Sequence, residues 1–150
     1  MSWRSMLMAT AVAAANPELE EGAPDWVEIT QEDARDIRMM VREQLAAFRG
    51  GDATRAWTLC SRSIHLAFER PEKLMDLIRS RYQALIGPVG LSFGPWTLTP
   101  EGLGLMLDVR SAEGDVHRAL FLVVKERGVG WRINGALLVG GPEEALAEAA

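Results

Sequence analysis

Two polar residues in the C-terminal half of the chain, Asp108 and His117, could together transfer a proton. They lie on either side of Glu113-Gly114, a dipeptide typical of a tight β-turn. If that dipeptide forms a two-residue turn, Arg110 faces His117 and Asp108 is its diagonal neighbour on the same face of the sheet. Such an Asp–His pair is suited to general acid–base catalysis. The competing interpretation is a surface cluster of charged residues, because the alternating leucines of the same strand fall on the opposite face.

A second cluster of reactive residue types surrounds His65. Cys60 and several hydroxyl residues are near it in sequence, but Glu69 is the only nearby carboxylate. A nucleophile needs a base within reach and a third group that orients the base. We therefore interpret His65 as a partly exposed histidine between two helices. With one cysteine and two histidines in the chain, we predict no catalytic residue, no metal site and no cofactor.

Polar side chains also fall on the inward stripes of the predicted helices: Gln44, Arg81 and Tyr82. They could line a pocket with Phe48 and Trp57 as apolar walls, or they could bond one another and the backbone in a dry core. The pocket would suit a small, mostly apolar molecule with one acidic or carbonyl group, which Arg81 could bind through a charge-assisted hydrogen bond. In the alternative, Arg81 extends to solvent along its aliphatic stem.

The elements that must position these residues are helices first and strands second. Thr30 and Asp33 predict a capping box, and apolar residues then recur at helical spacing from 37 to 48. Asp52 is placed to cap a second helix, and Pro71 suits the first turn of a third. These residues predict three helices, with an uncertain link at 61–70.

From residue 89 onward the apolar period changes to two, which predicts strands. We expect them near 91–98 and at 103–109, 116–125 and 131–139. The first should be an edge or bulged strand because Pro95 interrupts it. The third is apolar on both faces and should be central. Helices followed by about four antiparallel strands define an α+β fold.

The alternation assigns side chains to the two faces of the sheet. The face predicted to pack against Val41, Leu45 and Ile78 carries five apolar residues: Leu105, Leu107, Leu120, Leu122 and Ile133. The opposite face carries a second apolar set, with polar residues around it: Met106, Phe121, Val123, Ala136 and Leu138, and Asp108, Arg110, His117 and Asn134. Because an exposed apolar sheet face usually marks an interface, we expect a homodimer through this sheet face, with the His117 cluster at its rim.

Several short motifs, in order, resemble the opening of the NTF2-like superfamily: Gln-Leu-Ala-Ala-Phe at 44–48, Gly-Asp-Ala at 51–53 and the aromatic Trp57. More narrowly, the chain is similar to the bacterial DUF4864 family. That resemblance adds Phe68, Pro71-Glu72, Arg79 with Tyr82, Phe93 and Trp131-Arg132-Ile133. It implies an NTF2-like domain over 30–140, in which helices pack into a curved antiparallel sheet. It also implies that such domains often pair through the sheet, but it implies no agreed activity. Family members usually have Ser-Pro where this chain has Ser61-Arg62.

Length and charge limit the remaining possibilities. The chain has 150 residues and a net charge of −5, which suits a single domain and argues against a general nucleic-acid binder. No apolar run is long enough for a membrane span. Residues 1–29 form a tail whose first 15 residues resemble a weak export signal, and 141–150 form a second tail. We expect a cytoplasmic protein, or alternatively an exported one. Two functions remain open: non-catalytic binding of a small apolar ligand or a protein partner, and an isomerase- or hydratase-type enzyme.

Overall fold

The computed structural model describes residues 29–139. The predicted tails, including the segment that could direct export, lie outside the described residues except for Ile29. The described chain forms four α-helices, a short 3₁₀ helix and then four strands. Their order is α4 (Gln31–Gly50), α5 (Ala53–Thr58), α6 (Arg62–Phe68), α7 (Pro71–Arg81), η1 (Gln83–Leu85), β1 (Gly90–Thr99), β2 (Gly102–Arg110), β3 (Val116–Glu126) and β4 (Gly130–Val139). The α+β prediction is therefore confirmed, and no described helix is long and apolar enough to span a membrane.

Helix α4 begins and ends where its sequence signals predict. The Thr30 hydroxyl accepts the Asp33 amide at 3.0 Å, and the Asp33 carboxylate accepts the Thr30 amide at 3.3 Å. This reciprocal pair is the predicted capping box. At the other end Gly51 has φ +65°, a left-handed conformation that favours glycine and ends the helix. Asp52 then caps α5 through the Arg55 amide, as predicted.

The link at 61–70 contains a helix that the sequence analysis left open. The Ser61 hydroxyl accepts the Ile64 amide at 3.3 Å and so caps α6. The helix ends at Glu69, which has φ +73° although it is not glycine. Pro71 then begins α7 directly. The departure from the family's Ser-Pro is thus compatible with a capped helical turn.

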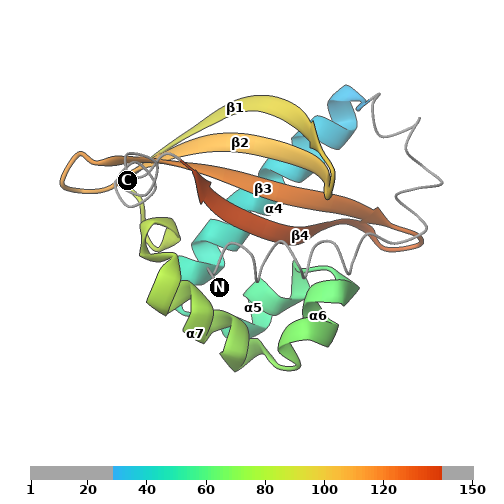
Figure 1. Cartoon of the computed structure of the whole chain (residues 1–150), viewed down its shortest axis with the longest axis horizontal. Helices are drawn as coiled ribbons and strands as arrows, with labels where there is room; N and C mark the ends of the chain where they lie inside the picture. The colour runs from blue at the N-terminus through green and yellow to red at the C-terminus, as the bar shows by residue number, and fades with distance from the viewer. Residues whose placement is uncertain (1–28, 140–150) are drawn as a thin grey trace.

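The four strands form one antiparallel sheet in the order β1-β2-β3-β4. β3 lies between β2 and β4, as its two-sided apolarity predicted. β1 is an edge strand with a bulge between Phe93 and Trp96, which confirms the effect predicted for Pro95. In Figure 1, α4 runs diagonally behind the sheet, and α5, α6 and α7 lie together beyond β4.

The predicted turn between β2 and β3 is wrong. The strands pair Arg110 with Val116 and Val109 with His117, so the connection consists of residues 111–115. Two backbone hydrogen bonds close this loop: the Ser111 amide donates to the Asp115 carbonyl, and the Gly114 amide donates to the Ser111 carbonyl. The added residue shifts the register by one, and a shift of one moves a strand's side chains to the other face of the sheet.

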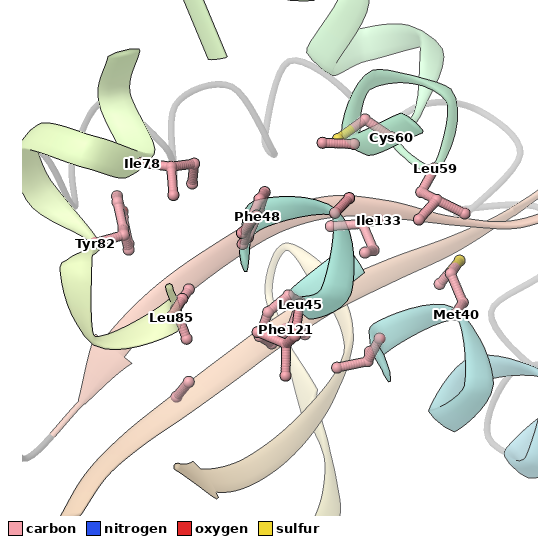
Figure 2. Packing of buried hydrophobic residues seen from close by; sticks show 14 of the residues in the cluster. Met40, Leu45, Phe48, Leu59, Cys60, Ile78, Tyr82, Leu85, Phe121 and Ile133 are labelled. Atoms are coloured by element: carbon pink, nitrogen blue, oxygen red, sulfur yellow. The ribbon is translucent and has the colours of Figure 1, made fainter. Parts of the chain in front are cut away.

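That shift corrects the assignment of the core. Phe121 and Val123, predicted on the outer face, are each 1% exposed and pack in the same cluster as Leu45, Phe48 and the other buried helix residues. Figure 2 shows Phe121 beside Leu45 and Phe48. Leu138 is partly buried against this same cluster. Ala136 also packs against this cluster, so the homodimer prediction loses four of its five apolar residues and keeps only Met106 on the outer face.

The face of the sheet that points away from the helices carries a second, smaller cluster. It contains the buried residues Leu120, Leu122 and Leu137, with Met106 and Val139 packed against them. The prediction that Leu120 and Leu122 face the helices is thus wrong, whereas Leu105, Leu107 and Ile133 do belong to the helix-facing core. No residue of a described helix contributes to the smaller cluster.

The outer edge of β4 is covered at its centre by the link between α5 and α6. The Ser61 amide donates to the Ile133 carbonyl at 2.8 Å, and the Ile133 amide donates to the Leu59 carbonyl at 2.9 Å. Cys60 and Ile133 thereby form an isolated parallel bridge. Figure 2 shows Ile133 close to Leu59 and Cys60.

Candidate functional site

The structure separates Arg81 from the other predicted pocket residues. Gln44, Phe48 and Tyr82 are buried in the core at 1%, 4% and 0% exposure, and the Tyr82 hydroxyl donates to the Ala136 carbonyl at 3.2 Å. Arg81 is exposed at the end of α7. The guanidinium and the phenol, although adjacent in sequence, therefore point to different surroundings, because the helix ends between them.

Trp57 and His65, the remaining aromatic candidates near this region, bind each other. Their rings stack with centroids 4.3 Å apart, and His65 Nε2 donates to the Trp57 carbonyl at 2.6 Å. The imidazole thus links α5 to α6 and has a structural role. Cys60 is fully buried, and burial raises the pKa of its thiol to about 12 despite the hydrogen bond from Gln44. A thiol that is protonated at neutral pH is a poor nucleophile.

The Asp108–His117 pair does not form. Asp108 pairs directly with Arg118 in the register and accepts its Nε–H at 3.0 Å. His117 lies opposite Val109, on the other face of the sheet from Asp108. Arg110 is exposed beside Val116. The proton-transfer interpretation of this cluster is therefore wrong, and its physical reason is the register shift described above.

A groove among the described residues lies elsewhere, between α4, α5 and the hairpin that joins β3 to β4. This groove has a volume of about 720 Å³. One flank of α4, the end of α5 and the hairpin line it: Thr30, Glu32, Asp33, Asp36, Met39, Met40, Glu43, Arg55, Thr58, Leu59, Lys125, Val129, Gly130, Trp131 and Arg132. Its volume is in the range typical of small-molecule sites.

Asp33 connects the two walls of the groove. Its carboxylate accepts hydrogen bonds from the indole N–H of Trp131 at 3.1 Å and from the backbone amide of Thr30 at 3.3 Å. The same carboxylate lies 3.8 Å from the Lys125 ammonium group. Partial desolvation raises the pKa of Asp33, but the hydrogen bonds from Trp131 and Thr30, together with the Lys125 charge, outweigh it and leave the pKa below the ordinary value of 3.8. Asp33 is accordingly a weak base with a structural role.

The charges that line the groove do not balance. Four carboxylates face three cationic side chains. Glu43 pairs with Arg55 and Asp33 pairs with Lys125, whereas Glu32 and Asp36 are exposed and form no ion pair with another described residue. Trp131 adds an aromatic surface beside them. The arrangement can attract a cation and hold an apolar group next to it.

A smaller hollow lies on the outer face beside the bulge of β1. It has a volume of about 160 Å³ and is lined in part by Asp108 and Arg118. These two groups already satisfy each other. Among the described residues, no group of three or more His, Cys, Asp or Glu side chains could hold a metal ion.

The groove was not predicted from the sequence, although its signal is present in α4. On a helical projection the carboxylates at 32, 36 and 43 fall on one flank of the buried stripe and the arginines at 35, 38 and 42 on the other. This segregation predicts two chemically different surfaces along one helix. What the sequence cannot supply is the approach of Trp131, which lies 98 positions from Asp33.

The fold and these surfaces define an α+β domain with an open antiparallel sheet. The model of one family, a domain of unknown function designated DUF4864, matches residues 30–146. The chain belongs to this family, which confirms the resemblance to DUF4864. No curated protein and no solved structure matches the chain.

Proposed function

We propose that this protein is a non-catalytic binding domain, and that its ligand occupies the groove between α4, α5 and the β3–β4 hairpin. The observation that carries the proposal is the uneven charge of the groove beside Trp131. Glu32 and Asp36 are exposed carboxylates without an ion-pair partner among the described residues, and Met39 offers apolar surface at 52% exposure. The ligand class is a small, partly apolar molecule that carries a cationic group.

Binding without turnover is supported by the state of the groups that could act on a ligand. Asp33 is held by three partners and its pKa is lowered. Glu43 is paired with Arg55. Neither histidine lines the groove. An isomerase or hydratase needs an acid and a base poised around the reacting carbon, with pKa values near the working pH.

A protein NMR titration tests the site. 2-Phenylethylamine should shift the indole N–H signal of Trp131, which a Trp131→Phe variant assigns. 3-Phenylpropionate has a phenyl ring on a two-carbon chain but a negative charge, and it should leave this signal nearly unmoved. The Glu32→Gln, Asp36→Gln double variant should bind the amine roughly fivefold more weakly, since each exposed ion pair contributes up to about 1 kcal/mol. Glu72→Gln, on the exposed first turn of α7, is the matched control.

The proposal fails if the amine does not move the Trp131 signal, or if the amine and the carboxylate move it equally. Incubation of the amine with the protein should also return it chemically unchanged. The homodimer remains a prediction as well, but its apolar contacts must now come from the outer face, where Met106 and Val139 lie. Light scattering that gives the mass of one chain at tens of micromolar would contradict it.

A further inference from the structure

The flank of α4 opposite the groove carries arginines. Arg35, Arg38 and Arg42 follow one another at helical spacing, so they project from one side of the helix. This side faces β1, because two of the three guanidinium groups lie over aromatic rings of that strand. Arg38 is 5.4 Å from the centre of the Trp96 ring, and Arg42 is 5.1 Å from that of Phe93.

Within residues 29–139, no carboxylate neutralises either of the two arginines. Neither Arg38 nor Arg42 forms an ion pair with a described residue, although both lie on a protein with a net charge of −5. The Nε of Arg38 is buried and has no hydrogen-bond partner in the described part of the chain. Like charges four positions apart on a helix also repel each other. Both guanidinium groups lie over the Phe93 ring, at 6.0 and 5.1 Å from its centre, so an oxyanion bound to their terminal N–H groups would reduce this repulsion.

The aromatic rings beneath the arginines remain partly accessible. Phe93 and Trp96 are only partly buried, and Leu98, on the same face of β1, is 53% exposed. The edge strand β1 thus presents a strip of accessible apolar surface next to the two arginines. A ligand that has only an anionic group would leave this strip unused, whereas one with an attached aryl or alkyl group would cover it.

We propose that Arg38 and Arg42 form a carboxylate-binding site, and that the apolar group of the bound molecule lies on Phe93, Trp96 and Leu98. The ligand class is a small aryl or alkyl carboxylate. The site is separate from the groove, since it lies on the other flank of α4 and shares none of the residues that line the groove. It keeps the predicted ligand chemistry but replaces Arg81 with two arginines held in place by aromatic rings.

The same NMR experiment with a different reporter tests this site. 3-Phenylpropionate should shift the indole N–H signal of Trp96, assigned with Trp96→Phe, and the Nε–H signals of Arg38 and Arg42. 2-Phenylethylamine and inorganic phosphate alone should shift them far less. Because the two sites report through different tryptophans, failure of one proposal is distinguishable from failure of the other.

Variants then identify the charge that binds. Arg42 is exposed, so the Arg42→Gln variant should fold normally. It should bind 3-phenylpropionate roughly tenfold more weakly, as expected for loss of a charge-assisted hydrogen bond. Arg38→Lys keeps the charge but loses the planar fork, and should retain part of the affinity. Arg79→Gln on α7 should change nothing. The proposal is overturned if Arg42→Gln binds as tightly as the unaltered protein, or if phosphate shifts the arginine signals and 3-phenylpropionate does not.

Discussion

Substitution of Asp33 by alanine should destabilise the protein by about 1–3 kcal/mol, because one carboxylate serves two elements. Loss of the bond from the Thr30 amide to the carboxylate costs about 0.5–1.5 kcal/mol, while the Thr30 hydroxyl still accepts the backbone amide of residue 33. Loss of the acceptor for the Trp131 indole adds about 0.5–1.5 kcal/mol. The contact with Lys125 adds little, because the lysine side chain is 63% exposed and its ammonium group is 3.8 Å away.

The effect of Asp33 should depend on pH with a defined sign. The pKa of Asp33 is lower in the folded protein than its ordinary value of 3.8. The stabilisation is therefore fully present above about pH 4 and is lost as the pH falls through the folded pKa. Urea unfolding followed by tryptophan fluorescence, at neutral pH and at pH 3, should give a smaller difference between wild type and Asp33→Ala at the lower pH.

A double-mutant cycle separates the two roles of the carboxylate. Trp131→Phe removes the indole donor, and its coupling to Asp33→Ala should equal about 0.5–1.5 kcal/mol. Asp33→Asn keeps a side-chain oxygen as acceptor and should cost less than alanine. A coupling near zero, together with a pH-independent difference, would refute the assignment of Asp33 as the link between α4 and β4.

Three further substitutions test other parts of the structure. Gly104→Ala should destabilise by about 1–3 kcal/mol, because a Cβ there would lie 2.6 Å from a methyl carbon of Leu120; equal midpoints in urea would contradict this. Glu69→Gly should raise the free energy of unfolding by up to about 1 kcal/mol, since it relieves a positive φ, and an unchanged midpoint in urea would contradict this. Tyr82→Phe should cost about 0.5–1.5 kcal/mol through the bond to the Ala136 carbonyl, and calorimetry that shows no loss would place this phenol outside the core network.

Local signals in the sequence were sufficient to predict most of the elements. The Thr30 cap, the Asp52 cap, Pro71 and the bulge near Pro95 act through neighbouring residues, and the structure confirms each. The elements missed or misplaced depend on longer-range information. α6 is stabilised by its Ser61 cap and by contacts with β4, and the sequence of the short link does not reveal the contacts with β4.

The assignment of side chains to the two faces of the sheet also depends on information that a single strand does not contain. β3 is apolar on both faces, so its composition cannot say whether Phe121 or Leu122 points toward the helices. The choice depends on the loop at 111–115, where one additional residue reverses it. The predicted pocket failed for a similar reason. Arg81 and Tyr82 are adjacent in sequence, but helix α7 ends between them, so that Arg81 is exposed and Tyr82 is buried.

The bridge between Cys60 and Ile133 has a consequence for self-association. An uncovered strand edge presents free amide and carbonyl groups that can template pairing with another chain. The α5–α6 link occupies those groups at the centre of β4, and the bulge beside Pro95 interrupts β1 at the other edge. Transient detachment of the link would expose β4 while the rest of the sheet stays folded. Hydrogen exchange at the Ile133 amide would report that opening, and its rate should track the tendency of the protein to aggregate.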